Sequence, residues 1–230
     1  MNVRFLRIAT VLTAWLALAP LAAWSAESEI KLPKPSFSGK MSVEEALSRV
    51  RTARQFTSAP LTLPQVSQIL WAANGILPTD AVSGATLKVV PSAGGLYPIE
   101  VFLVVGENTL TGLPAAVYLY RPQGNSLQEV CPGDKRIEVA EAAFRQGWLA
   151  QAPVLIIIGG VFQRTMQRYG NQGVNYVLME AGNANQNICL QAPSLELKSG
   201  TVGAFNAGQM STALKLPSDV TPLLIVAVGR

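Results

Sequence analysis

The sequence predicts an α+β fold with a mixed central β-sheet flanked by helices, built as one domain over residues 42–230. Three observations predict it. Strand-like and helical segments mix without strict βαβ alternation, no internal repeat is present, and one long, nearly uncharged helical stretch covers residues 171–193. With 49% hydrophobic and 14% charged residues among 230, the chain has the composition of a compact globular domain.

The first 26 residues have the pattern of a secretory signal peptide. Arg4 and Arg7 precede an apolar run, and small residues favour cleavage near Ser25 or Ala26. An uncleaved membrane anchor is the alternative, but the run is short for a membrane span and contains Pro20. We therefore expect an exported, periplasmic protein. Residues 27–41 contain Pro and Ser without periodicity, which predicts a linker.

Charge and residue usage exclude several classes of function. The signal segment carries two of the 18 Lys and Arg residues and none of the 14 Asp and Glu residues. The mature net charge is then about +2, too small to indicate a nucleic-acid partner. Without histidine there is no Ser-His-Asp triad and no histidine metal site, so no metal is expected. Cys131 and Cys189 allow a disulfide, but two buried thiols are an equal alternative.

Two short helices open the domain. Ser42-x-x-Glu45 is a capping box that starts a helix through about residue 50. Thr62-x-x-Gln65 starts a second helix through about residue 74, and Gly75 ends it. Residues 77–90 form a loop.

The remaining strands and helices follow from hydrophobic periodicity and run length. Residues 154–158 form a continuous apolar run, typical of a strand covered on both faces. The other expected strands cover residues 100–106, 116–120, 126–130, 199–205 and 223–228. The other expected helices cover residues 134–147, 162–168 and 206–214.

The helix expected over residues 171–193 organises the chain. Its apolar residues recur at helical spacing and form one stripe. The stripe consists of Val174, Val177, Leu178, Ala181, Ile188, Ala192 and Leu195. The remaining surface carries amides and small residues, and Glu180 is its only charge. Such a helix is expected to be packed on most sides, with an ordinary core helix as the alternative.

Two segments are candidates for ligand binding. Arg51, Thr52 and Arg54 can converge on one anion, because the guanidinium fork suits phosphate oxygens and Thr adds a hydroxyl. The alternative is a solvated helix end. In Pro91–Pro98, two glycines after small residues let the backbone approach a flat ligand, with a plain turn as the alternative.

Together, four stretches of this chain resemble the nitroreductase family of FMN flavoproteins. They are residues 51–56, 91–98, 176–192 and 202–205. LWAANGI, PSAGGLYP and MEAGNANQN are similar to the branch of thiazole/oxazole-forming peptide dehydrogenases. The resemblance covers residues 42–230 and implies an FMN cofactor and a dimer built on the long helix.

The resemblance also implies roles for particular residues. Arg51, Thr52 and Arg54 would hold the FMN phosphate and ribityl end, with Arg230 reaching the phosphate. The flavin would be bordered by Pro91, Ser92, Ala93 and by the Gly203 and Ala204 backbone near its reactive nitrogen. Val50 and Gly95 depart from the family pattern, which has a second basic residue and often Asn there.

The leading hypothesis is an exported FMN-dependent oxidoreductase that transfers two electrons as hydride, nitroreductase-like or azoline-dehydrogenase-like. The chain has no dinucleotide fingerprint, so a donor such as NAD(P)H would stack on the flavin itself. We expect a homodimer that uses a small-molecule donor and acceptor. The alternatives are a non-catalytic module that binds FMN or another flat ligand, and a structural dimer without cofactor.

Overall fold

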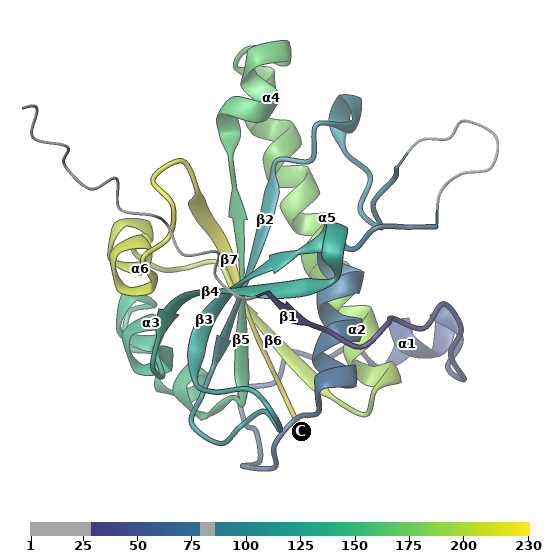
Figure 1. The fold of residues 1–230 in the computed structure, drawn as a ribbon, viewed down its shortest axis with the longest axis vertical. Helices are drawn as coiled ribbons and strands as arrows, with labels where there is room; N and C mark the ends of the chain where they lie inside the picture. Colours follow the sequence, from purple (N-terminus) through teal and green to yellow (C-terminus); the bar gives the residue numbers. More distant parts are fainter. Residues whose placement is uncertain (1–28, 79–85) are drawn as a thin grey trace, which may run out of the picture.

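A computed structural model describes residues 29–78 and 86–230. The predicted signal peptide and part of the predicted loop over residues 77–90 lie outside the described residues. Within them, seven strands form one sheet in the order β1-β4-β3-β2-β5-β7-β6. Helices lie on both faces of this sheet, so the predicted α+β class is confirmed (Figure 1).

The strands and helices lie close to where the sequence predicts them. The strands are β1 (Ile30–Lys31), β2 (Ile99–Val105), β3 (Ala116–Arg121), β4 (Ser126–Pro132), β5 (Val154–Gly160), β6 (Lys198–Val202) and β7 (Thr221–Gly229). The α-helices are α1 (Val43–Arg49), α2 (Leu63–Asn74), α3 (Arg136–Ala142), α4 (Phe162–Tyr169), α5 (Gln172–Ser194) and α6 (Ala207–Leu214). Short 3-10 turns are η1 (Ala93–Gly95), η2 (Pro122–Gly124) and η3 (Gly147–Gln151).

The expectation of a mixed sheet was wrong for the strand pairs of the described residues. All six pairings of named strands are antiparallel. β5 and β6 run in the same direction, because α4 and α5 return the chain between them, but β7 is inserted between the two and pairs with both. Within residues 29–78 and 86–230, parallel pairing occurs only at isolated bridges such as Thr52 with Ser199.

Two hydrophobic cores lie on opposite faces of the sheet. Alternate residues of the central strands enter each core: Leu103 and Ile156 enter the first, Phe102 and Ile157 the second. The first core is closed by α2 and α5, and the second by α3 and α6. Figure 1 shows these helix pairs on opposite sides of the sheet. All seven residues of β5 are buried, as its apolar run predicts.

Two other expectations need correction. Residues 29–41 were expected to form part of a linker, but Ile30–Lys31 pairs with β4 and Leu32 is buried in the first core. The helix expected over residues 134–147 ends at Ala142. Phe144 and Arg145 adopt left-handed backbone conformations, and the Ala142 carbonyl accepts a hydrogen bond from the Asn206 N–H instead of continuing the helix.

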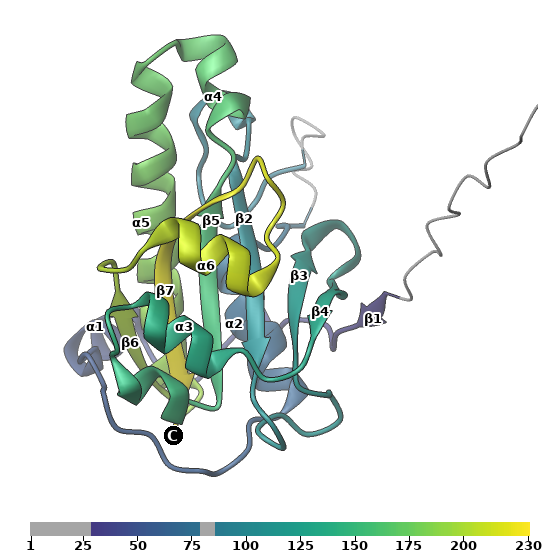
Figure 2. The same ribbon diagram turned by 90° about the vertical axis from the view of Figure 1, so that its left-hand side faces the viewer.

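Helix α5 is 23 residues long, and its upper part extends with α4 beyond the ends of the strands (Figure 2). One face is buried in the first core, including Val177, Ala184 and Ile188. The opposite face is open in the single chain, where Leu178 is 48% and Met179 62% exposed. Leu178 therefore does not belong to the buried stripe that was predicted. No helix of residues 29–78 and 86–230 is long and apolar enough to cross a membrane.

Candidate functional site

The segment that follows α1 is fixed against the edge of the sheet. The Ala53 N–H donates to the Ser199 carbonyl at 2.9 Å, and Thr52 forms a bridge with the same residue of β6. The next residue of β6 is Gly200, where a Cβ would lie 2.1 Å from the Ala53 carbonyl oxygen. Phe56 stacks on Trp148 with 6.3 Å between ring centroids. Only glycine at position 200 allows this close approach.

The same segment reaches the last residue of the chain. The Thr57 N–H donates to the Arg230 carbonyl at 2.7 Å. The Nε of Arg230 is buried and has no hydrogen-bond partner among the described residues. A buried donor without a partner costs about 1–3 kcal/mol, and an anion bound beside it would satisfy it. Arg230 is thus close in space to the segment that contains Arg51 and Arg54.

A cavity of about 250 Å³ opens next to this segment. Its walls carry three basic side chains and two hydroxyl groups, and no acidic residue lines it. These residues are Arg49, Arg51, Lys198, Thr52 and Ser199. The donor set suits a phosphate group, so the residues present fit the anionic end of a cofactor such as FMN. Cys189 also lines this cavity, and both it and Cys131 are free, buried thiols.

The two predicted arginines differ in how they are used. Arg51 Nη1 donates to the carbonyls of Ser48 and Val50, at 3.1 and 2.6 Å, and so caps the end of α1. Arg54 is exposed and forms no ion pair with any residue of the described chain. Arg49 pairs with Glu45 at 2.6 Å. Arg54 is therefore the arginine of this segment whose side chain forms no ion pair within the described residues, and it lies next to the cavity-lining residue Ala53 without lining the cavity itself.

Gly203 and Ala204 directly follow β6, and both are exposed. The Ala204 carbonyl accepts a hydrogen bond of 3.5 Å from the Gln146 side chain. The added Cβ of a substituted Gly203 would meet only Leu224, at 3.6 Å. The backbone here is open to a flat ligand, and β6 connects it to the basic cavity at the other end of the strand.

Pro91, Ser92 and Ala93 lie in a different part of the fold from the basic cavity and the end of β6. They form the loop around η1, in which Gly94, Gly95 and Tyr97 all have positive φ. Ser92 Oγ accepts the Tyr97 N–H at 2.8 Å, and the Tyr97 carbonyl accepts from Arg164 Nη1 at 3.0 Å. These bonds hold a backbone conformation that costs about 1–2 kcal/mol at a residue other than glycine.

A buried acidic residue next to this loop was missed as a site residue. Glu180 of α5 is 3% exposed, and Ser92 and Lys88 are near enough to its carboxyl group to affect its pKa. Burial raises the pKa of Glu180 from 4.5 to about 7, against the opposing effects of Ser92 and of Lys88. The sequence did contain a signal, since Glu180 follows Val177 by three residues and precedes Ala184 by four, which places it on the buried stripe.

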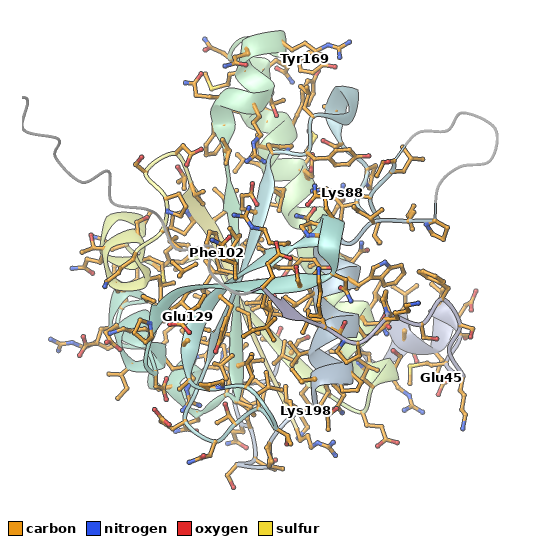
Figure 3. All side chains as sticks on the ribbon, viewed as in Figure 1. Glu45, Lys88, Phe102, Glu129, Tyr169 and Lys198 are labelled. Atoms are coloured by element: carbon orange, nitrogen blue, oxygen red, sulfur yellow. The ribbon has the colours of Figure 1, made fainter. Side chains whose placement is uncertain are left out.

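Lys88 completes this cluster. Its Nζ donates to Asn74 Oδ1 at 3.1 Å and lies 5.0 Å from the centre of the Tyr97 ring. Burial lowers the pKa of Lys88, partly offset by the charges of Glu100 and Glu180. In Figure 3, Lys88 lies well above Lys198, which lines the basic cavity, so this cluster and the basic cavity are in different parts of the molecule.

The predicted site residues therefore form two groups within one chain. Arg51, Thr52 and Arg54 lie with Arg230 near the start of β6, and Gly203 and Ala204 follow the end of that strand. Pro91, Ser92 and Ala93 lie beside the middle of α5, around Glu180. The single chain does not unite these two groups in one described cavity.

Comparisons with known proteins agree with this architecture. The sequence model of the nitroreductase family matches residues 47–230. The protein named "Putative nitroreductase MJ1384" of Methanocaldococcus jannaschii is 38% identical over 202 residues, which are 88% of this chain and 96% of that protein. The microcin B17-processing protein McbC of Escherichia coli is 27% identical over 150 residues, 64% of this chain and 55% of McbC.

Among solved structures, a nitroreductase-type protein of Ralstonia eutropha superimposes with a TM-score of 0.75 at 26% identity, covering 90% of both chains. The McbBCD microcin synthetase complex of E. coli contains a chain with the same fold, at a TM-score of 0.67 and 22% identity, covering 96% of this chain and 84% of that one. The similarity to McbC agrees with the peptide-dehydrogenase branch inferred from the motifs. Because its family model covers most of the sequence and a relative is 38% identical over nearly its whole length, this chain belongs to the nitroreductase family.

Proposed function

We propose that this protein is an exported, FMN-dependent oxidoreductase that transfers two electrons as hydride between a small-molecule donor and an acceptor. The observation that carries the proposal is the basic cavity beside Arg51 and Thr52, together with the buried, unpaired Nε of Arg230. The donors of the cavity suit an anion and the Nε of Arg230 lacks a partner, and the family resemblance puts the FMN phosphate beside this segment. When bound, FMN supplies the hydride chemistry.

The residues of the chain would bind and orient the cofactor. Arg54 and Arg230 would neutralise the phosphate, and the Thr52 hydroxyl would add a hydrogen bond. The exposed Gly203 and Ala204 backbone leaves room for a flat ring at the far end of β6. Pro91, Ser92 and Ala93 would border the ring. A flavoenzyme of this kind needs few side chains for proton transfer, which suits a chain without histidine.

The exposed face of α5 supports a homodimer in this proposal. Its exposed residues follow helical spacing and carry no charge. They are Gln172, Asn175, Leu178, Met179, Gly182, Asn183 and Gln186. An uncharged stripe with two half-exposed apolar side chains suits the same stripe of a second copy. A dimer would also bring a second loop of residues 91–98 into the assembly.

Absorption spectroscopy of purified protein tests the cofactor, followed by mass analysis of what denaturation releases. We expect a flavin spectrum and FMN. The Arg51→Ala/Arg54→Ala variant should lose FMN, since each charge-assisted bond to a phosphate contributes about 1.5–3 kcal/mol. Arg145→Ala, an exposed arginine near the other helix layer, is the matched control. A colourless protein that ignores added FMN would instead favour a structural dimer without cofactor.

Stopped-flow reduction tests catalysis. NADH, NADPH and an artificial donor are mixed with the flavin form, and a nitroaromatic or a quinone reoxidises it. We expect reduction by one donor and reoxidation by an acceptor, in a ping-pong sequence at one open site. Flavin that no donor reduces would favour a non-catalytic flavin-binding module.

The similarity to McbC favours a second class of donor. In an azoline-dehydrogenase-like reaction, a peptide thiazoline or oxazoline would lose a hydride and a proton and become the aromatic azole. The test replaces NADH by a thiazoline-containing peptide under anaerobic conditions. Bleaching of the flavin together with a mass loss of two hydrogens from the peptide would support this substrate class, and an unreacted peptide would contradict it.

A further inference from the structure

The basic cavity and the exposed end of β6 are joined by a row of residues on one side of that strand. Ser199 lines the cavity, and Gly203 is exposed just beyond the end of the strand. Thr201 lies between them, because residues two apart in a strand face the same side. A Cβ at Gly203 would meet Leu224, which packs against the first core, so this side of β6 faces α5. From Ser199 to Gly203 the strand advances about 13 Å.

A polar pair lies in the middle of this row. The Thr201 hydroxyl donates to the side-chain oxygen of Asn185 in α5 at 2.7 Å. The Cys189 Sγ lies 3.8 Å from Thr201 Oγ1 and 4.0 Å from Asn185 Oδ1. Cys189 is itself a wall residue of the basic cavity, so the pair is one side chain away from that cavity. Both members of the pair are half-buried.

The pair can still form hydrogen bonds of both kinds. A threonine hydroxyl has one proton and two lone pairs, and Thr201 uses its proton for Asn185. Its oxygen can therefore accept from a ligand. The amide nitrogen of Asn185 carries two N–H donors, and neither has a partner within residues 29–78 and 86–230. The pair thus offers acceptor and donor groups side by side, without a net charge.

Such a pair suits a polyol better than a phosphate. Each hydroxyl group of a polyol both donates and accepts, whereas a phosphate accepts and is bound best by charged donors. The charged donors are in the basic cavity, at the Ser199 end of the row. The chemistry of this side of β6 therefore changes along the strand, from cationic at Ser199 to neutral and polar at Thr201 and to open backbone at Gly203.

We propose that Asn185 and Thr201 bind the hydroxyl groups of the ribityl chain of FMN, and so select a flavin whose side chain is a polyol. The inference rests on the proposed function, which puts the phosphate in the basic cavity and the ring beside Gly203. A chain that joins these two places has to pass Thr201. Asn185 and Thr201 are 16 residues apart, and neither was a predicted site residue.

The test compares the binding of two ligands that differ only in the linker. One is FMN, and the other is a flavin phosphate in which a plain pentyl chain replaces the ribityl chain. Ring and phosphate are the same, so their contacts cancel in the ratio of the two Kd values. Fluorescence titration measures both Kd values. The wild type should prefer FMN by about three- to tenfold for each hydrogen bond to the ribityl chain.

Three variants and one control separate a role in binding from a purely structural one. Thr201→Val and Asn185→Leu each remove polar atoms at nearly constant volume, and the double variant removes the pair. We expect each single variant to lower the preference for FMN and the double variant to bring the ratio of Kd values close to one. A pair that only joins α5 to β6 would instead weaken both ligands equally. Thr212→Val, at an exposed position of α6, is the control and should keep the wild-type ratio.

Urea denaturation checks that the variants are folded. Valine keeps the β-branched shape of threonine in a strand, so Thr201→Val decides if Asn185→Leu does not fold. A wild type that binds both ligands equally, or an unchanged ratio in the folded variants, would overturn the role of Asn185 and Thr201 and leave the proposed function intact. A wild type that binds neither ligand would overturn the proposed function itself, and this inference with it.

Discussion

Gly200→Ala is the sharpest test of how the fold positions the basic cavity. The new Cβ would lie 2.1 Å from the Ala53 carbonyl oxygen, about 1.3 Å short of the 3.4 Å at which ordinary contact begins, and 3.2 Å from the Trp148 ring. The Ala53 segment must move away, because the atom it meets is backbone. That movement breaks the 2.9 Å bond from the Ala53 N–H to the Ser199 carbonyl.

The expected cost follows from three effects. Overpacking costs about 1–3 kcal/mol, and the lost hydrogen bond adds about 1 kcal/mol. Replacing glycine by alanine returns about 0.4–1 kcal/mol by restricting the unfolded chain. We therefore expect a net loss of about 1–4 kcal/mol in the free energy of unfolding, measured by urea denaturation. FMN affinity should fall at least about tenfold, because Thr52 and Arg54 move with the segment.

Gly39→Ala is the matched control, because a Cβ there meets nothing within 4 Å. It should leave both stability and FMN affinity nearly unchanged. A Gly200→Ala protein with the stability and affinity of the wild type would refute the reasoning, because the segment after α1 would then not be held against β6.

Four further predictions follow from the same structure. Arg230→Met should weaken FMN binding about tenfold or more without loss of unfolding free energy, since it removes the unpaired Nε; unchanged affinity by titration would exclude Arg230 from the site. Because the pKa of Glu180 is raised from 4.5 to about 7 on folding, its favourable contribution is complete below pH 4.5 and is lost as the pH rises through 7. The wild type should therefore lose up to about 3 kcal/mol relative to Glu180→Gln between these values, and parallel urea-denaturation profiles would contradict this. Leu178→Lys should convert a dimer to a monomer in light scattering, whereas Ala184→Arg, a substitution in the core of the single chain, should unfold it. Amino-terminal sequencing of protein from an expressing cell should begin just after Ser25 or Ala26, and a mature chain that keeps residues 1–20 would contradict export.

Much of the fold could be predicted from the sequence because local chemistry fixes it. The Thr62 capping box forms as its spacing indicates, and Gly75 follows the last residue of α2. The long helix α5 begins and ends within one residue of its predicted bounds. The apolar run in β5 is buried on both faces. Each of these features depends on residues only a few positions apart, so the local sequence is enough to predict it.

The candidate site was only partly predictable for the opposite reason. Arg51, Thr52 and Arg54 were identifiable as an anion-binding group by residue type, and the family resemblance supplied Arg230. Two contacts of this segment could not be predicted: the hydrogen bond from Thr57 to the Arg230 carbonyl and the packing of Ala53 on Gly200. Both join residues more than 140 positions apart, and no local sequence pattern encodes such contacts.

Glu180 illustrates the difference between what local sequence spacing predicts and what only tertiary contacts reveal. Its place on the buried stripe of α5 follows from spacing alone, since Val177 and Ala184 lie three and four residues away. Ser92, which acts on the pKa of Glu180, comes from a loop 88 residues earlier, and only the structure placed that loop near α5. The sequence by itself determined most of the helices and strands and most of the side chains buried on them, but the prediction placed Leu178 on the buried stripe and Glu180 outside it. Only the tertiary structure decided which polar groups meet, because burial is a property of one element and a hydrogen bond requires two.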